Sequence, residues 1–335
     1  MAIFRCNECG HVREVGNNYL GNPVKCPKCK RVAHVHDTTT FVKAIVGKLL
    51  VQKKELEELR SNQDTPLAKT HVDLSEDLIF DGVDVNNTNV LAQESNLSVI
   101  ANWFDQRQIE AEFNPDAADT TGFFDEVALR LGDDFELLSG VTKQIKYIQN
   151  KGYANAKLDV SKHSQQDLAK VQAFCSELYD YSFVAKNFHN KKTKAIHLTL
   201  QTAPKIRDFF NGYWMEWYVL IKLMQFIDNN KIAAACTRSV NVKFKAGNAN
   251  ELDLFMLSAD GVPLCIECKT GEFRHDIDKY LSLRKQLGIR QSQFVICVFG
   301  LSDEQAIGMT SMYDLTFVNE RTLMGHVESV LKYSN

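Results

Sequence analysis

The sequence lacks long apolar runs and an export signal, and each absence argues against a class of protein. No run approaches the ~20 apolar residues that a helix needs to span a bilayer, which argues against a transmembrane protein. The first residues show no charged start followed by an apolar stretch, so we expect no signal peptide and a cytoplasmic location. With only 6 prolines and 17 glycines in 335 residues, the composition is also unlike that of a disordered or fibrous protein.

A strong charge of either sign is missing from the chain as a whole, but not from its parts. The 39 Lys and Arg nearly balance the 42 Asp and Glu, which gives a formal charge of −3. Residues 71–140, however, hold 16 acidic and 2 basic side chains, a balance of −14. Residues 180–295 hold 17 basic and 11 acidic side chains, a balance of +6. The basic region favours an anionic partner such as a nucleic acid, which the total charge alone disfavours.

The length predicts more than one domain, because a typical domain has about 100–200 residues. The expected fold class is multidomain α/β, with a small zinc ribbon, a helical connector, a mixed α/β middle part and a C-terminal α/β domain. The expected boundaries are 1–38 for the ribbon, 39–70 for a heptad helix and linker, 71–133 for an acidic helical segment, 134–203 for the middle part and 204–335 for the C-terminal domain.

Four of the nine cysteines lie within the first thirty residues and have the spacing of a zinc site. Cys6-Asn-Glu-Cys9 is followed by sixteen residues and then by Cys26-Pro-Lys-Cys29. Four thiolates leave no open coordination position, so we expect a structural Zn²⁺ ion. The spacing leaves open whether the ribbon contacts DNA, RNA, protein or its own chain. The remaining cysteines lie among apolar residues and are predicted to be buried packing residues: Cys175, Cys236, Cys265, Cys268 and Cys297.

Residues 40–62 have the heptad spacing of an amphipathic helix, with one polar interruption. The seam positions are Val42, Ile45, Leu49, Gln52, Leu56 and Leu59. Fewer than three heptads is short for a coiled coil, so the helix either forms a homodimer or packs on its own chain. Residues 61–66 then have the composition of a linker.

The acidic segment is predicted to contain helices over 97–113 and 123–131, with Trp103 and Phe104 on or near an apolar face. Its charge is compatible with metal binding, with mimicry of nucleic acid, or with repulsion of nucleic acid from a closed site. We favour a solvated face with a regulatory role or a surface for a regulatory partner protein.

The middle part has the pattern of two helices and a hairpin. The predicted elements are a helix over 134–151, a strand over 155–160, a helix over 163–178 and a hairpin of 182–187 with 194–200. The turn of this hairpin holds Lys191, Lys192 and Lys194. Helices followed by a hairpin with a lysine-rich tip resemble a winged-helix module, whose wing often contacts phosphates. Only one helix of the usual helix-turn-helix pair is evident.

The C-terminal domain mixes helices with apolar strands. The predicted elements are a helix over 212–226, strands over 239–245, 250–257 and 263–271, a helix over 276–287 and a buried strand over 293–299. Asp260-Gly261 between two apolar runs predicts a hairpin turn.

Regular alternation in these strands brings acidic residues and a lysine together. Glu267 and Lys269 share one face of their strand, and Glu251 and Asp253 share a face of the preceding strand. If the two strands pair, Asp253, Glu267 and Lys269 converge, and Glu216 on the preceding helix can join them. Carboxylates are ligands for Mg²⁺ or Mn²⁺, and a lysine can orient or activate water beside a scissile phosphate.

An acidic residue on one strand and Glu-x-Lys on the next resemble the PD-(D/E)XK nuclease superfamily. The matching residues are Glu251-Leu-Asp253 and Glu267-Cys-Lys269, within the longer segments 212–220, 250–253, 266–271 and 278–288. Over 205–330 these segments resemble the nuclease domain of the CRISPR-associated ancillary nucleases. The resemblance implies a restriction-endonuclease-like α/β fold for 204–335 and hydrolysis of phosphodiester bonds.

The resemblance also implies roles for single residues. Asp253 and Glu267 would bind the catalytic Mg²⁺ or Mn²⁺ together with a neighbouring main-chain carbonyl. Lys269 would activate or position the attacking water, and Glu216 would be an auxiliary ligand. Glu251 is a further candidate for the same cluster.

In that family the N-terminal part is a Rossmann-like CARF sensor, whereas this chain has a zinc ribbon, a heptad helix and an acidic segment there. We therefore expect nuclease chemistry without activation by cyclic oligoadenylate.

The main hypothesis is a metal-dependent endonuclease that cuts DNA, with RNA as a further substrate, in antiviral defence or repair. The alternatives are a non-catalytic zinc-ribbon adaptor or nucleic-acid-binding protein on a degenerate nuclease scaffold, and a transcription regulator. The candidate nucleic-acid-binding residues are Lys191, Lys192, Lys194, Lys243, Lys245, Arg284 and Lys285.

Overall fold

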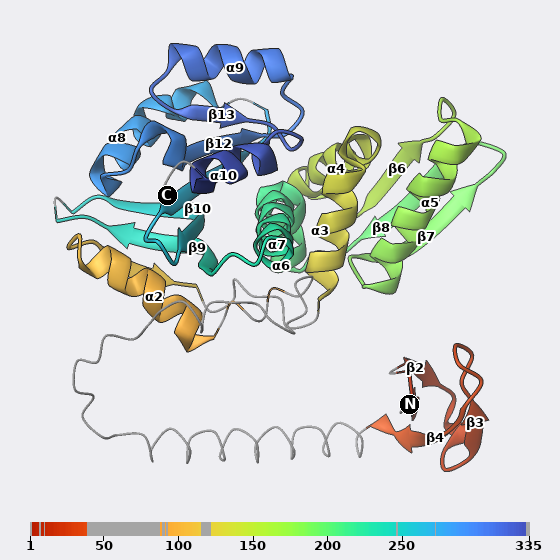
Figure 1. The fold of residues 1–335 in the computed structure, drawn as a ribbon. Helices are drawn as coiled ribbons and strands as arrows, with labels where there is room; N and C mark the ends of the chain where they lie inside the picture. The colour runs from red at the N-terminus through yellow and green to blue at the C-terminus, as the bar shows by residue number, and fades with distance from the viewer. Residues whose placement is uncertain are drawn as a thin grey trace, which may run out of the picture. The chain divides into compact units, whose positions relative to one another are not determined.

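The computed structural model divides the chain into two compact units, residues 1–72 and 73–335, which we describe separately (Figure 1). The described residues are 2–6, 8, 9, 11–38, 88, 91, 93–114, 122–245, 247–271 and 273–332. The predicted heptad helix over 40–62 and the linker after it lie outside this part, as do sections of the acidic segment. None of the described helices is long and apolar enough to cross a membrane.

The first unit is a small antiparallel sheet. Its strands are β1 (Ala2–Arg5), β2 (Val12–Val15), β3 (Pro23–Lys25) and β4 (Val32–Asp37), in the order β2-β1-β4-β3, with a 3₁₀ turn at Asn17–Tyr19. Two of the six residues in its buried cluster are the cysteines Cys6 and Cys26, beside Phe4 and Val35. A core this small stabilises a fold weakly, so the cysteines are expected to contribute through a bound metal.

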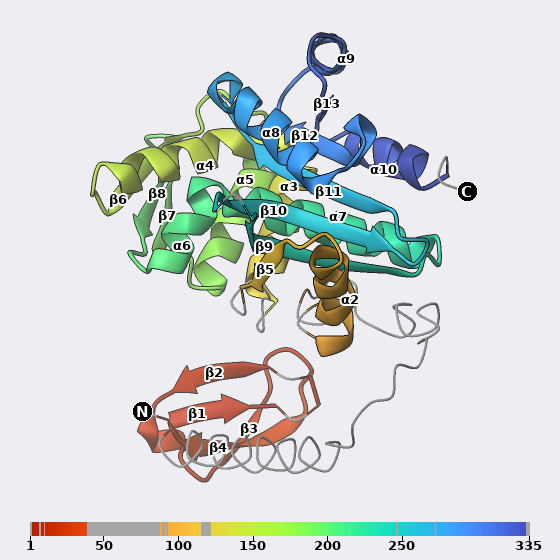
Figure 2. The same cartoon turned by 90° about the vertical axis from the view of Figure 1, so that its left-hand side faces the viewer.

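The second unit is built on a six-stranded sheet with the order β13-β12-β11-β10-β9-β5 (Figure 2). The strands are β5 (Glu110–Phe113), β9 (Ala234–Lys243), β10 (Ala249–Ser258), β11 (Pro263–Lys269), β12 (Phe294–Val298) and β13 (Thr316–Val318). β5, β9, β10 and β11 pair antiparallel, whereas β12 and β13 extend the sheet in parallel from β11. The sheet is therefore mixed, with β11 at the junction of its two halves.

Helices cover both faces of this sheet. One apolar cluster joins the sheet to α3 (Phe123–Asp133), α4 (Phe135–Asn150), α7 (Trp214–Asn229) and α10 (Leu323–Lys332). The other cluster joins it to α2 (Glu94–Asp105), α8 (Ile277–Leu287) and α9 (Asp303–Met312). α7 is the central helix, since 11 of its 16 residues are buried, including the polar Glu216.

A three-stranded antiparallel sheet lies beside these helices. β6 (Asn155–Asp159), α5 (Gln165–Asp180), β7 (Val184–Asn190) and β8 (Ala195–Leu200) follow α4 in the chain, and the sheet order is β6-β8-β7. α5 begins at Ser164, whose hydroxyl accepts a hydrogen bond from the Asp167 N–H. The helices and strands predicted for residues 134–200 are all present. The short helix α6 (Pro204–Asp208) and the π-helical turn Phe209–Tyr213 lead from β8 into α7.

In the acidic segment the predicted helix over 123–131 is present as α3, whereas the other predicted helix differs. The expected helix over 97–113 ends at Asp105, and residues 110–113 form β5, which pairs with β9 at the edge of the large sheet. The hydrophobic pattern changes from the helical repeat to strict alternation here, because polar and apolar residues alternate in Glu110-Ala-Glu-Phe113 as they do in an edge strand. The aromatic rings of Trp103 and Phe104 pack on Phe255 of β10. β5 thus belongs to the large sheet, with α2 packed on it, while α3 packs on α7.

Candidate functional site

The predicted acidic cluster lies where β10 and β11 stop pairing as a regular ladder. The two strands form a hairpin whose turn contains Gly261 at φ +75°, as Asp260-Gly261 predicted. Their recorded pairing ends at Leu254 and Ile266. Beyond this point the Asp253 N–H donates to Glu267 Oε1 (3.3 Å), and the Cys268 N–H donates to Asp253 Oδ2 (2.8 Å). Each carboxylate is therefore held by the backbone of the opposite strand.

The other neighbour of β10 is also irregular at this level. β9 and β10 pair on both sides of Ser239 and Asp253, but the ladder leaves these two opposed residues out. Ser239 has φ +53°, in the left-handed region that non-glycine residues rarely adopt. Leu252 packs in the same apolar cluster as Phe255 and Leu257, although strict alternation would place it on the opposite face. The alternation of side chains is thus shifted at Asp253, as in a bulge.

This shift changes the position predicted for Glu251. Regular alternation placed Glu251 and Asp253 on one face, but the interruption at Asp253 separates them. Glu251 is exposed. Its charge acts on Tyr213 and Glu216, which lie at the start of α7. Glu251 is therefore the outermost acidic candidate around the site.

Lys269 completes the contact between the two strands. Its Nζ atom lies 2.9 Å from Asp253 Oδ2 and 3.4 Å from Glu267 Oε2. The Tyr280 ring of α8 lies on the same side of the sheet, with its centroid 5.8 Å from Nζ. The side chain of Lys269 is 26% exposed, whereas that of Glu267 is 2% exposed. Solvent thus reaches the amine end of the cluster, while Glu267 is enclosed.

Glu216 approaches from α7 and is held by residues of β9. Its Oε2 atom accepts hydrogen bonds from Arg238 Nη1 (3.2 Å) and Ser239 Oγ (3.4 Å). The Arg238 guanidinium also lies over the Trp217 ring, 3.6 Å from its centroid. Both members of this ion pair are nearly buried. The carboxylate of Glu216 is thus fixed by two neighbouring residues of one strand.

A further buried carboxylate, on α3, acts on Arg238. The buried Asp125 carboxylate accepts hydrogen bonds from the Thr88 N–H (2.9 Å) and Thr88 Oγ1 (3.1 Å), and its charge acts on Arg238. Sequence reasoning missed Arg238. The signal was an arginine in the interior of the predicted core domain, next to apolar residues of the strand Ala234–Lys243, since a buried charge of this kind requires an acidic partner.

Burial disfavours the ionised forms of Glu267 and Glu216, and the charge of Asp253 adds to this effect. Burial, followed by the charge of Asp253, raises the pKa of Glu267 to about 7. Burial and then Asp253 also raise the pKa of Glu216 to about 8, although Arg238 acts in the opposite sense. Burial lowers the pKa of Lys269, but Glu267 and Asp253 outweigh it and raise this pKa above its ordinary value. A cation near Glu267 would therefore favour its ionised form.

A divalent cation bound by carboxylate oxygens would offset this cost of burying the carboxylates. Mg²⁺ and Mn²⁺, the predicted ions, are cations that prefer such oxygen ligands. The three carboxylates Glu216, Asp253 and Glu267 are less tightly grouped than the ligands of an all-protein metal cage. Within the described ranges, the cysteine cluster alone brings three or more His, Cys, Asp or Glu ligand atoms within 4.8 Å of one another. Mg²⁺ commonly keeps several waters and uses one or two carboxylates, so Asp253 and Glu267 are sufficient in number.

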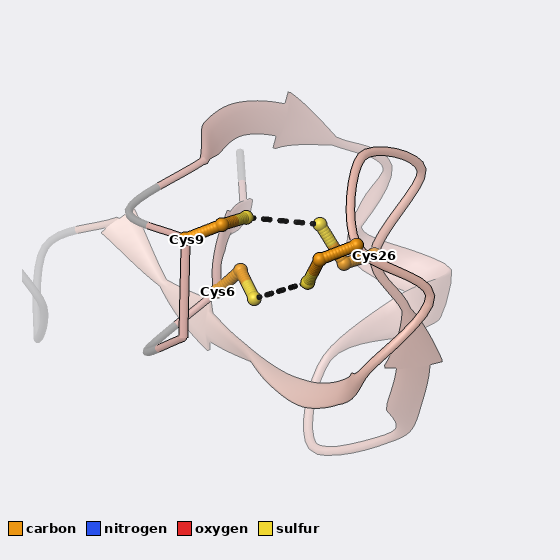
Figure 3. A group of neighbouring side chains, drawn as sticks. Cys6, Cys9 and Cys26 are labelled. Carbon is orange, nitrogen blue, oxygen red and sulfur yellow. Dashed lines mark hydrogen bonds between the residues drawn. The ribbon is translucent and has the colours of Figure 1, made fainter.

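The four cysteines of the first unit do meet at one point (Figure 3). Sγ of Cys6 lies 3.4 Å from Sγ of Cys29, and Sγ of Cys9 lies 3.6 Å from Sγ of Cys26. Sulfurs bound to one zinc ion at about 2.3 Å are about 3.8 Å apart in a tetrahedron, so the arrangement fits a metal such as zinc. The Cys9 N–H, the largest influence, lowers the pKa of Cys6 to about 7, which favours the thiolate form that binds metal.

The remaining cysteines agree with their predicted role. All five are buried. Cys265 and Cys268 belong to different apolar clusters, on opposite faces of the sheet, so they do not form a second metal knuckle.

The predicted nucleic-acid-binding residues fall into two groups. Lys191, Lys192, Lys194, Lys245 and Lys285 are exposed. Lys243 is exposed too, but its Nζ atom forms an ion pair with Glu110 of β5, at 3.4 Å from Oε2. Arg284 differs from the prediction, because its side chain is only 12% exposed and pairs with Asp314. It also donates to the Ile289 carbonyl, which gives it a structural role at the end of α8.

No protein-family model and no curated protein matches the chain. Among solved structures, it is similar to protein VC1899 from Vibrio cholerae, with 18% identity and a TM-score of 0.47 over 70% of this chain and 60% of that one. It is also similar to Can2 from Sulfobacillus thermosulfidooxidans in complex with cyclic tetra-adenylate, with 17% identity and a TM-score of 0.48 over 69% of this chain and 59% of that one. The chain therefore spans about three fifths of each neighbour, and at these values neither assigns an activity to it.

Proposed function

We propose that the chain is a metal-dependent nuclease that hydrolyses phosphodiester bonds of DNA, with RNA as a further substrate, in antiviral defence or repair. The observation that carries the proposal is the contact of Asp253, Glu267 and Lys269 where β10 and β11 separate. Two carboxylates and one amine at an interruption of an apolar sheet are costly for stability, which favours a chemical role. The same residues support the resemblance to PD-(D/E)XK nucleases.

In this proposal each side chain has a separate task. Asp253 and Glu267 hold Mg²⁺ or Mn²⁺, which supplies positive charge to the scissile phosphate and lowers the pKa of a bound water. Lys269 is the most exposed of the three and positions the attacking water beside the phosphate. Arg238 and Ser239 hold Glu216, which acts as an auxiliary ligand. Glu251 stays an outer candidate for the same cluster.

The other parts of the chain are proposed to bring the substrate to this site. The four cysteines bind a structural Zn²⁺ that folds the first unit. The order β6-β8-β7 with α5 before the hairpin supports the winged-helix-like interpretation of the middle part. The exposed lysines Lys191, Lys192, Lys194, Lys245 and Lys285 then offer phosphate contacts. The heptad helix over 40–62 is proposed as a homodimer contact.

A cleavage assay tests the reaction. Purified full chain, with its zinc retained, is incubated with plasmid, single-stranded DNA and RNA in Mg²⁺, in Mn²⁺ or without an added divalent cation. We expect metal-dependent cleavage that falls at least about 100-fold in Glu267→Gln and in Lys269→Ala, because each removes a charge that acts at the reacting phosphate. The matched controls Glu304→Gln and Lys332→Ala, both on exposed parts of helices, keep full activity. Undiminished cleavage by both site variants refutes the assignment.

The second candidate is the non-catalytic zinc-ribbon adaptor or nucleic-acid-binding protein. The observation that favours it is the tight cluster of four cysteines, which contrasts with the looser carboxylates among the residues described. It predicts nucleic-acid binding without turnover in either metal, and binding that Glu267→Gln leaves unchanged.

A further inference from the structure

The three-stranded sheet has one face that is not covered by its helix. α5 packs on the opposite face, where Asn187 Nδ2 donates to Ser176 Oγ (3.3 Å) and His189 contacts Gln172. On the outer face, the Phe188 side chain is 62% exposed. Single exposed apolar side chains are common on protein surfaces, so the neighbours of Phe188 and not its exposure alone decide whether it has a role.

The outer face places basic and aromatic side chains in one cross-strand row. Lys157 of β6, His197 of β8 and Phe188 of β7 are direct neighbours across the sheet, and all three are exposed. The rings of Phe188 and His197 are tilted by 35°, with their centroids 6.4 Å apart. The next row contains Asn155, Thr199 and Lys186, in which Thr199 Oγ1 donates to Asn155 Oδ1 (3.2 Å).

The adjoining turns add positive charge. Residues 155–162 and 184–200 contain six lysines and one acidic residue, Asp159. The lysines are Lys157, Lys162, Lys186, Lys191, Lys192 and Lys194. The β7–β8 turn is shaped by Asn190, whose Oδ1 accepts hydrogen bonds from the Lys192 and Thr193 N–H groups (3.0 and 3.2 Å).

Some lysines on the surface have a carboxylate partner. Lys170, Lys222 and Lys332, for example, each pair with a carboxylate. Over the described ranges, none of the six lysines of the sheet and its turns makes such an ion pair. In the described part of the chain, this sheet therefore presents a local excess of positive charge, six lysines against Asp159, next to an exposed aromatic ring.

We propose that this outer face, defined by Lys157, Lys186, Phe188 and His197 and continued by the turn lysines, binds single-stranded nucleic acid. Bases stack on the Phe188 and His197 rings, while the lysines contact the phosphates along the strand. A duplex hides the faces of its bases, so it can use the lysines but not the rings. The surface extends the phosphate contacts that the proposed function gives to Lys191, Lys192 and Lys194, but its binding does not depend on the reaction at Asp253 and Glu267.

Binding is measured by fluorescence anisotropy with labelled oligo(dT) and oligo(U), in full chain carrying Glu267→Gln and without added Mg²⁺ or Mn²⁺, so that cleavage plays no part and the zinc of the first unit is kept. We expect Phe188→Ala to weaken single-strand binding about fivefold or more, because stacking contributes about 1–3 kcal/mol per base. Phe188→Leu should weaken it similarly, and Phe188→Tyr should preserve it. Tyr179→Ala, which removes an aromatic ring of similar exposure on α5, is the matched control and should bind normally.

The contribution of the lysines is measured separately, from the dependence of the binding constant on salt concentration. Lys157→Gln with Lys186→Gln should lower the slope of log K against log salt by about 0.7 per lysine on single strands. Lys170→Gln with Lys332→Gln, which removes lysines that already have carboxylate partners, should leave it unchanged.

Three results overturn the proposal. The first is unchanged single-strand binding in Phe188→Ala or Phe188→Leu. The second is an equal loss of affinity of Phe188→Ala for a duplex of the same length, which would assign Phe188 a role other than stacking. The third is an absence of strand binding combined with a change of oligomeric state in Phe188→Ala, which would make this face a protein interface.

Discussion

At the scale of single residues, Arg238 connects the candidate site to the core of the second unit. Its guanidinium lies against the Trp217 ring and donates to Glu216, while burial lowers its own pKa. A buried pair of this kind gives little net stability, but removal of one partner leaves the other charge unpaired. Arg238 is therefore expected to position Glu216 rather than to contact substrate.

The first prediction concerns this pair. Arg238→Met should lower the free energy of unfolding by about 3 kcal/mol, because it leaves the buried Glu216 carboxylate without its cation. Arg238→Met combined with Glu216→Gln should recover most of the loss. Urea unfolding of the two variants and the unchanged chain measures both effects. Equal unfolding midpoints for Arg238→Met and the unchanged chain would show that the pair is not structurally coupled.

At the scale of elements, α2 joins the acidic segment to the sheet. Trp103, Phe104 and Phe255 form a compact aromatic group, with ring centroids 4.8–5.1 Å apart. Removal of residues up to 134 would take away α2, β5 and α3 and would expose the faces of β9, β10 and α7 on which they pack. Such a truncation would test stability rather than inhibition by the acidic segment.

The second prediction follows from this packing. Phe104→Ala should destabilise the second unit by about 3–5 kcal/mol, because the ring is fully buried and leaves a cavity. Tyr147→Ala, at an exposed aromatic of α4, is the control and should change the unfolding free energy by less than about 0.5 kcal/mol. A small effect of Phe104→Ala would mean that α2 detaches from the sheet before the sheet unfolds.

Elements were predictable where a local signal determines them. The Asp260-Gly261 turn and the two Cys-x-x-Cys pairs are such signals, and the structure contains the hairpin and the cysteine cluster. The left-handed Ser239 and the shift at Asp253 were not predictable, because they depend on the pairing of three strands and not on residue type. For the same reason, the sequence predicted that Asp253, Glu267 and Lys269 converge, as they do, but it misplaced Glu251 and gave no role to Arg238.

At the scale of the whole molecule, acidic and basic regions meet within one sheet. β5 carries exposed Glu110 and Glu112 at the edge next to β9, which carries Lys243. The net charge of −3 therefore describes neither region. An anionic substrate near β9 would experience both signs of charge, and salt would screen both.

The third prediction tests whether this edge opposes nucleic acid. Glu110→Gln with Glu112→Gln should strengthen nucleic-acid binding about two- to threefold at low salt and have no effect at about 0.5 M salt, because surface charge is screened. Glu304→Gln with Glu328→Gln is the control pair on α9 and α10. Anisotropy titrations at both salt concentrations measure the difference. An effect that persists in high salt would contradict a charge mechanism.

The order of the strands in the large sheet also has a kinetic consequence. β9, β10 and β11 follow one another along the chain and pair antiparallel, whereas β12 and β13 join through longer connections that contain α8 and α9. Contacts between segments close in sequence cost less loop-closure entropy and form sooner. Asp253, Glu267 and Lys269 all lie on the local hairpin. We therefore expect this cluster to assemble early in folding, before the parallel strands dock and complete the burial of its carboxylates.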